Sequence, residues 1–277
     1  MIQAVTDAGQ LADAIGRVVR SGKGYATNLF ASPAEKASWI ASRTLSLLQE
    51  EQAMLVVRRD TGFHRLYHVA SDAASLSAAL QALCAAMPEA TLVADLVGKR
   101  GSTGAVVDAY LGHAFVRHER LQRMYRLAEH PSAHDGRIDA EVVQAGPADV
   151  RRIHALMQRQ LDPFSEQVPD LDELRDAVAK RSVLVVSRDS ELAGVLVYDT
   201  VGFTSTLRHW HVDPRFRNQG VGARLIRAFF DLCRDSQRIL LWVIAGNDDA
   251  IAKYRHYGFR DDSLVDDIML RQPRLVQ

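Results

Sequence analysis

Hydrophobic positions in the C-terminal half of the chain recur first with a helical period and then with a strand-like one. Segment 147–161 places four apolar residues on one helical face: Val150, Ile153, Leu156 and Met157. Further helices are predicted over 170–180, 220–235 and 248–258. Strands are predicted over 140–145, 182–189, 192–200, 204–212 and 238–244, and 259–271 supplies the closing strands. This alternation predicts a layered α/β domain.

The N-terminal half repeats this order of elements. Helices are predicted over 10–19, 32–50 and 72–87, and the second begins with a capping box formed by Ser32 and Glu35. Strands are predicted over 53–59, 63–70 and 90–97. Segments 108–126 and 252–271 each carry a tyrosine, then glycine and phenylalanine nearby, then a methionine and a final arginine. The shared order and the shared residues predict an ancient duplication.

A polar seam over 128–139, with Pro131 and Gly136, separates the two patterned halves. It predicts two domains, residues 1–130 and residues 137–277. The chain of 277 residues is 47% hydrophobic, which suits two cores of this size.

Charge and cysteine content narrow the function classes. Lys+Arg and Asp+Glu both number 34, so the formal net charge is zero, which argues against a nucleic-acid partner. No apolar run approaches the roughly 18 residues that would span a bilayer, and the N-terminus lacks a signal-peptide pattern. Cys84 and Cys233 lie in apolar helical patterns, which predicts that they are reduced residues of the core. We therefore expect a cytoplasmic protein with no membrane partner.

The stretch VDPRFRNQGVG, residues 212–222, joins a predicted strand to a predicted helix. A helix N-terminus offers unpaired N–H groups and partial positive charge, and glycines let the backbone approach a ligand. The stretch therefore predicts a phosphate-binding loop. It lacks the Gly-Lys-Ser/Thr of one common phosphate loop and the third glycine of the dinucleotide fingerprint.

This stretch resembles the acetyl-CoA motif of the GNAT acetyltransferase superfamily, Val-x-Pro-x-x-Arg/Gln-x-x-Gly-x-Gly/Ala. One strand later comes an Asn, followed by a helix with a Tyr four residues before Gly-Phe, as the family also has: Asn247, Tyr254 and Gly258-Phe259. The resemblance spans about 140–271. It implies two GNAT-like domains, each a mixed, mainly antiparallel sheet flanked by helices. It also implies an acetyl-CoA site formed by Val212, Arg217, Asn218, Gln219, Gly220, Val221, Gly222 and Asn247.

The resemblance further implies direct attack of an amine on the thioester of acetyl-CoA, with no metal. The Val212 N–H is a candidate oxyanion donor, and Tyr254 would protonate the leaving thiolate as general acid. Family members place a base on the strand face shared here by Thr206, Arg208 and Trp210, none of which is an obvious base. His209 and His211 lie on the other face of a regular strand, and a bulge would change that parity.

Several residues keep a second interpretation. Asn247 could cap the following helix, and Trp210 could be a packing residue of the core. The loop residues Asp162, Ser165 and Glu166 could either be solvated or line the acceptor pocket. The N-terminal half has SDAASL after its strand 63–70 in place of a glycine loop, so we expect it to be degenerate and without a CoA site.

The prediction is an N-acetyltransferase for a small-molecule amine, compatible with a homodimer. The alternatives are transfer of a longer acyl group, a peptide or protein acceptor, or a non-catalytic acyl-CoA sensor.

Overall fold

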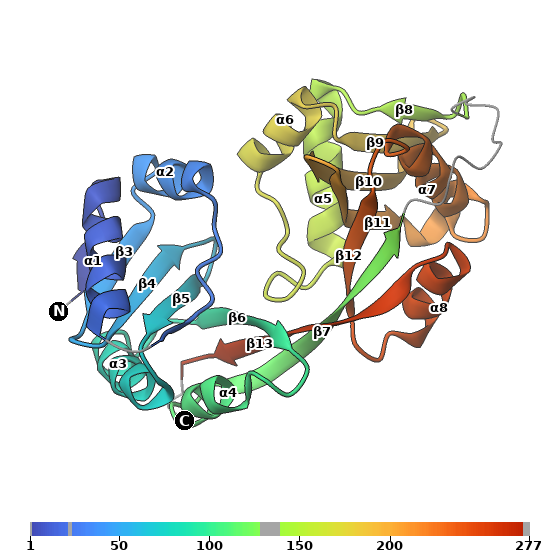
Figure 1. Ribbon diagram of the computed structural model, residues 1–277. Helices are drawn as coiled ribbons and strands as arrows, with labels where there is room; N and C mark the ends of the chain where they lie inside the picture. Colours follow the sequence, from blue (N-terminus) through green and yellow to red (C-terminus); the bar gives the residue numbers. More distant parts are fainter. Residues whose placement is uncertain (1, 22–23, 128–138, 274–277) are drawn as a thin grey trace. The chain divides into compact units, whose positions relative to one another are not determined.

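The computed structural model describes residues 2–21, 24–127 and 139–273, and the chain forms two compact units (Figure 1). Unit 1 consists of Met1–Leu121 and Ser263–Gln277, and unit 2 consists of Gln122–Asp262. The last segment of the chain therefore belongs to the first unit. Most of the predicted polar segment between the domains, 128–138, lies outside the described residues. The division into domains at 1–130 and 137–277 therefore stays a prediction.

Unit 1 is a mixed sheet with helices on both faces. Its strands are β1 (Ile2–Ala4), β2 (Ala26–Thr27), β3 (Leu45–Gln49), β4 (Ala53–Arg59), β5 (His64–Ala70), β6 (Leu92–Lys99), the first part of β7 (Val116–Leu127) and most of β13 (Arg260–Arg271). The order is β1-β3-β4-β5-β6-β13-β7, with β2 paired to β5. The helices are α1 (Ala8–Ser21), α2 (Pro33–Ala41), α3 (Ala73–Ala86) and α4 (Gly104–Leu111).

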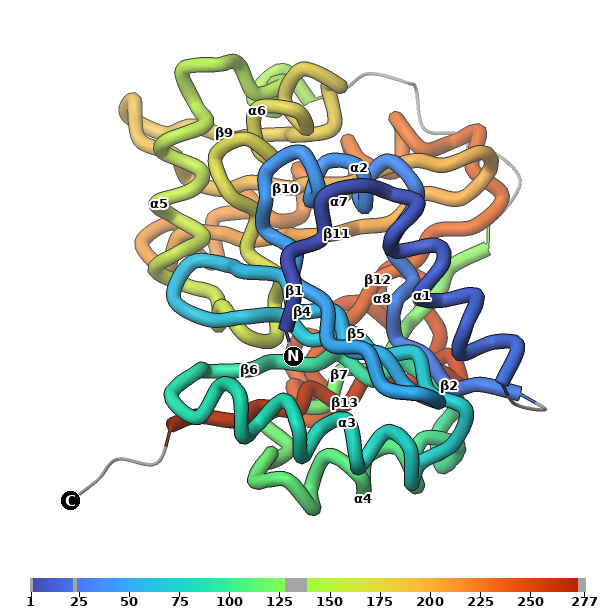
Figure 2. Tube along the Cα trace, turned by 90° about the vertical axis from the view of Figure 1, so that its left-hand side faces the viewer, coloured from blue at the N-terminus to red at the C-terminus, as the bar shows by residue number. Residues whose placement is uncertain are grey.

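Two cores fill unit 1, one on each face of its sheet. Leu76, Leu80 and Leu83 of α3 pack with Tyr110 of α4 against one face, where α3 and α4 lie side by side (Figure 1; Figure 2). Leu11, Ala14 and Val18 of α1 pack against the other face. Burial of apolar side chains on both faces stabilises the unit.

Unit 2 carries the predicted motif. Its helices are α5 (Val150–Gln160), α6 (Leu171–Ala179), α7 (Val221–Leu232) and α8 (Asp248–His256). Its strands β8 (Val142–Gln144), β9 (Val183–Arg188), β10 (Glu191–Val201), β11 (Thr204–Val212) and β12 (Arg238–Ile244) follow β7 in the order β7-β12-β11-β10-β9-β8. Helices α5 and α6 pack on one face of this sheet, and α7 packs on the other.

Two predicted elements were wrong. The helix predicted over 32–50 ends at Ala41, because Ser42 caps it and Arg43 takes a left-handed conformation with φ 55°. Residues 45–49 instead form β3, which pairs with both β1 and β4, and this tertiary pairing overrides the helical preference of their Leu and Gln residues. Segment 259–271 forms the single long strand β13 rather than several closing strands.

Candidate functional site

Strand β11 carries a β-bulge at Arg208. Its pairing with β10 runs from Gly194↔Val212 to Val197↔His209 and then shifts to Tyr198↔Leu207, so Arg208 is the extra residue. An inserted residue reverses the alternation of side chains beyond it. His209 and His211 therefore face the same side as their partners Val197 and Val195, which pack with α5 and α6.

The bulge corrects the expectation for a regular strand. Thr206 shares its face with His209 and His211, whereas Trp210 and Val212 lie on the α7 face with Leu207. The expected grouping of Thr206 with Trp210 is wrong. The two histidines are thus the titratable residues that β11 directs toward the α5–α6 side.

Strands β11 and β12 separate after a short parallel stretch. Their pairing covers only Thr204–Leu207 against Arg238–Leu241. Asp213 N donates to Ala193 O at 2.9 Å, so, by the antiparallel alternation, Val212 directs its own N–H and C=O away from β10. Its backbone groups therefore face the opening between the separated strands, where an extended ligand could pair with them.

The loop after β11 forms a concave set of backbone amides. Asn218 and Gly220 take left-handed conformations, with φ 63° and 78°, and Arg217 before them is extended. Gly220 is the N-cap of α7, and no described side chain caps the amides of its first turn. Alternating conformations of this kind make anion-binding nests, and the helix dipole adds partial positive charge. The sequence stretch thus has the geometry that phosphate binding requires.

The two motif glycines serve different purposes. A β-carbon on Gly220 would meet nothing within 4 Å, so this position needs glycine for its positive φ and leaves open space above the loop. A β-carbon on Gly222 would come within 3.4 Å of Trp210 and Val212. Trp210 Nε1 also donates to Gly222 O at 3.2 Å, and therefore Trp210 anchors the start of α7, as the packing interpretation expected.

The remaining motif residues surround this loop. Gln219 Nε2 donates to Arg215 O at 3.2 Å, and the Val221 side chain is buried in the core under α7. Asn247 Oδ1 accepts from Ala250 N at 3.2 Å, which confirms its role as the N-cap of α8. The Asn247 amide group can still donate to a ligand.

Tyr254 lies on α8 among aromatic rings. Its ring centroid is 5.7 Å from that of Trp210 and 5.8 Å from that of Phe259. Burial, and after it the negative charge of Glu166, raises the pKa of Tyr254 to about 12. The hydroxyl therefore keeps its proton at neutral pH, as a proton donor must.

Burial holds the two β11 histidines in the neutral form. It lowers the pKa of His209 to about 3, with smaller contributions from His211 and Arg208, and the pKa of His211 to about 4, with a contribution from Arg217. The ring centroids are 6.0 Å apart. Within the described ranges, no group of three metal-ligating side chains includes them. pKa values this low make the two imidazoles weak bases, so the pair suits passing a proton along a relay rather than retaining it.

The connection between α5 and α6 is ordered by its own carboxylates. Asp162 Oδ2 accepts from Ser165 Oγ at 2.6 Å and from Ser165 N at 3.2 Å, and Glu166 Oε2 accepts from Asp162 N at 2.8 Å. Ser165 is only 2% exposed, so the solvated-loop interpretation is wrong for this residue. Since Glu166 acts on the pKa of Tyr254, this connection reaches the neighbourhood of the candidate acid.

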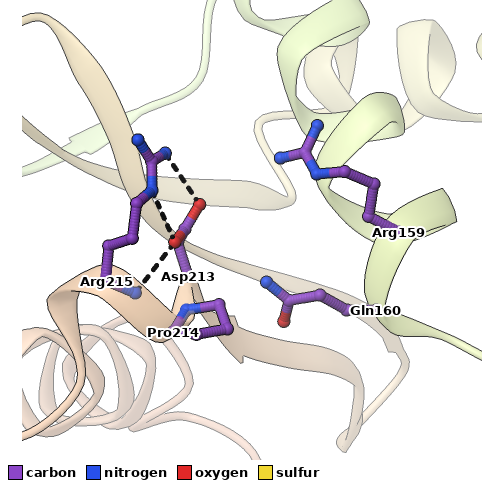
Figure 3. A pocket seen from close by; sticks show the side chains of 5 residues that line it. All are labelled: Arg159, Gln160, Asp213, Pro214 and Arg215. Carbon is purple, nitrogen blue, oxygen red and sulfur yellow. Dashed lines mark hydrogen bonds and ion pairs between the residues drawn. The ribbon is translucent and has the colours of Figure 1, made fainter.

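A pocket of about 480 Å³ opens beside the loop (Figure 3). Arg159 and Gln160 at the end of α5 face Asp213, Pro214 and Arg215 across it. The Asp213 carboxylate accepts three hydrogen bonds of 3.0 Å from Arg215, and these bonds and that charge lower its pKa. Arg159 and Gln160 were not predicted as site residues from the sequence, and a basic residue in the last turn of α5, Arg159, was the available signal.

In unit 1, strands β5 and β6 also separate after a short parallel stretch, but the side chain of Asn28 occupies the opening between them. Strands β5 and β6 pair only at His64↔Leu92 and Arg65↔Val93. Beyond that point, Asn28 Nδ2 donates to Leu66 O at 3.1 Å and to Asp95 O at 3.0 Å. His68 N donates to Asn28 Oδ1 at 2.6 Å. The Asn28 side chain therefore bridges the two separated strands.

Comparisons with known proteins agree with this geometry. Residues 150–259 match the family model described as the Acetyltransferase (GNAT) family. No curated protein matches the chain significantly. Within the described ranges, no helix of the chain is long and apolar enough to cross a membrane.

Solved structures share the fold over nearly the whole length. A GCN5-related N-acetyltransferase from Sphaerobacter thermophilus has a TM-score of 0.61 at 13% identity, covering 99% of this chain and 96% of that one. A tandem GNAT protein from the clavulanic acid biosynthesis pathway has a TM-score of 0.59 at 13% identity, covering 100% and 99%. A GNAT-family acetyltransferase from Colwellia psychrerythraea has a TM-score of 0.57 at 10% identity, covering 98% of each. The predicted fold class, a tandem GNAT-like α/β fold with mixed sheets, is thereby confirmed, whereas the domain bounds 1–130 and 137–277 stay a prediction.

Proposed function

We propose that this protein transfers an acetyl group from acetyl-CoA to the primary amine of a small molecule, and the match of residues 150–259 to the Acetyltransferase (GNAT) family model supports this proposal. One observation carries the proposal: the uncapped N-terminus of α7, with its nest of amides, directly follows the unpaired edge of β11 at Val212. The pyrophosphate of acetyl-CoA would accept hydrogen bonds from the amides of the nest. Its extended, amide-bearing pantetheine arm would pair with the free edge of β11.

The proposed reaction is a direct transfer. The amine nitrogen attacks the thioester carbonyl carbon, and the Val212 N–H would stabilise the oxyanion. The carbon–sulfur bond then breaks, and the Tyr254 hydroxyl gives its proton to the leaving thiolate sulfur. The proton lost by the amine passes through His209, His211 or water toward solvent, because both rings face the α5–α6 side and their low pKa values keep them from retaining it.

We propose that only unit 2 binds acetyl-CoA. In unit 1 the strand separation is bridged by Asn28, and α3 begins with the side-chain cap of Asp72, whose Oδ1 accepts from Ser75 N at 2.7 Å. A side-chain cap takes up the amides that would face a phosphate. Both features support the prediction that this half has no CoA site.

The cellular setting is part of the same proposal. Cys84 and Cys233 are free thiols, which fits a reducing, cytoplasmic location. The balanced charge of 34 basic and 34 acidic residues supports a small-molecule acceptor over nucleic acid. The proposal is compatible with a homodimer.

Calorimetric titration with acetyl-CoA tests the site. We expect one bound molecule per chain, and Gly220→Asp should weaken binding at least about 100-fold, because its carboxylate would stand where the phosphates are held. A β-carbon at this position meets no described heavy atom within 4 Å, so the remaining cost to the fold is the strain of a non-glycine residue at positive φ.

Gly202→Asp is the matched control. Gly202 also has a positive φ, 57°, with open space around it, and it lies in the turn between β10 and β11. This variant should bind like the wild type. Absence of binding to the wild type, a second site, or equal binding by Gly220→Asp would each refute the proposal.

A further inference from the structure

Unit 1 contains a second pocket, of about 260 Å³, at the end of the sheet where β3 begins and β4 ends. Its lining comes from five parts of the chain: Ile2, Arg43, Thr44, Ser46, Val57, Arg59, His64 and Met87. All of these residues belong to unit 1, and none belongs to the site proposed for acetyl-CoA.

The charge of this pocket is positive and uncompensated. Arg43 and Arg59 both line it, no carboxylate does, and neither guanidinium has an ion pair with any residue in the described ranges. Neighbouring arginines behave differently, since Arg58 pairs with Asp60 at 2.8 Å and Arg65 pairs with Asp95 at 2.9 Å. Two unpaired guanidiniums at one pocket favour an anionic ligand.

A buried polar atom also lacks a partner here. His64 Nδ1 is buried and makes no hydrogen bond to any residue that the structure describes, whereas the His64 backbone N donates to Thr91 O at 2.9 Å. A buried polar atom of this kind costs stability unless a ligand or water satisfies it. Ser46 adds a hydroxyl to the same lining. The pocket thus offers imidazole and hydroxyl partners beside its two cations.

The partial negative charge at the C-terminal end of α3 does not compensate the positive charge of the pocket arginines. Arg271 donates to Met87 O at 3.1 Å, to Pro88 O at 3.1 Å and to Ala90 O at 3.3 Å, so the carbonyls after the helix already have a cationic partner. The Ile2, Val57 and Met87 side chains form an apolar wall. A ligand can therefore carry a short apolar group beside its anion.

We propose that this pocket of unit 1 binds a small phosphomonoester with a short apolar substituent. The two guanidiniums of Arg43 and Arg59 hold the dianionic phosphate, and the apolar wall contacts the substituent. Unit 1 would then be a ligand-binding module with its own site, independent of whether unit 2 binds acetyl-CoA.

Titration of the full chain with butyl phosphate tests this proposal. Wild-type protein should bind butyl phosphate more tightly than inorganic phosphate, and butylamine should not bind. The double variant Arg43→Gln/Arg59→Gln should weaken butyl phosphate binding at least about tenfold, because each charge-assisted contact contributes measurably. Ser46→Asp, which places a carboxylate in the pocket, is a second variant and should weaken binding as well.

Two controls separate this pocket from other cationic surfaces. Arg151→Gln/Arg227→Gln removes the same charge from exposed positions on α5 and α7 and should leave binding within about twofold. Gly220→Asp, which disables the loop of unit 2, should also leave it unchanged. Wild-type affinity in the Arg43/Arg59 variant, equal binding of butylamine, or loss of binding in Gly220→Asp would overturn the proposal.

Discussion

At the scale of single residues, Tyr254 combines a packing ring with the hydroxyl that we propose as the general acid. Its ring lies among Trp210 and Phe259, and Trp210 in turn anchors the start of α7 through Gly222. The position of the hydroxyl is therefore tied to the loop that precedes α7. A raised pKa of about 12 keeps that hydroxyl protonated, because burial disfavours the phenolate.

Tyr254→Phe keeps the aromatic packing and removes only the hydroxyl. We expect the turnover number with acetyl-CoA and the best amine from a panel to fall about 100-fold, while the Kd for acetyl-CoA stays within about threefold. Steady-state kinetics and calorimetry measure the two quantities. Tyr257→Phe, on the neighbouring ring that also contacts Trp210, should retain turnover; wild-type turnover in Tyr254→Phe would exclude it as the acid.

At the scale of elements, the sequence predicted the strands and helices of unit 2 well but not the bulge at Arg208. Its motif and its spacing located the loop, α7 and α8 because these depend on local residues: glycines, caps and apolar periodicity. The bulge depends on the pairing of β11 with β10, which no single strand reveals. The faces of His209 and His211 were therefore left open by the sequence and decided by the structure.

Long-range pairing also explains the other misses. Residues 45–49 became a strand because β1 and β4 lie on either side of them, and Arg159 lines a pocket because the end of α5 meets the turn after β11. Asn28 is far in sequence from its partners at Leu66, His68 and Asp95. Such contacts have no local signature.

Asn28→Ala tests the importance of this bridge to unit 1. The variant leaves one buried N–H and two carbonyls without their partner, so the free energy of unfolding should fall by about 2–4 kcal/mol. Urea denaturation measures the change. Gln158→Ala, at an exposed position on α5, should change it by less than about 0.5 kcal/mol, and a loss below about 1 kcal/mol for Asn28→Ala would contradict the bridging role.

At the scale of the whole molecule, the two units are not separable by a single cut in the chain. Strand β13 crosses from unit 2 into unit 1, where Leu264–Arg271 pair with Leu92–Lys99 of β6. Ile268 and Met269 are fully buried there, and Asp267 pairs with Arg120 at 2.7 Å. The first unit is thus completed by residues more than a hundred positions beyond its main segment.

Removing residues 263–277 should therefore unfold unit 1 and spare unit 2. Loss of several buried side chains, each contributing about 2–5 kcal/mol, exceeds the typical stability of a domain. Limited proteolysis with mass spectrometry should show rapid cleavage within 1–121 and slow cleavage within 139–262. A chain ending after Arg271 keeps β13 and should resist cleavage in both; equal resistance of the shorter chain would contradict the prediction.

The same strand has a consequence for synthesis on the ribosome. Strand β6 keeps an unpaired edge until the final residues of β13 have been translated, and such an edge readily pairs with other chains. The nascent first unit must therefore wait, partly open, while the second is made and folds. A premature stop within β13 would damage the part of the protein that was translated first.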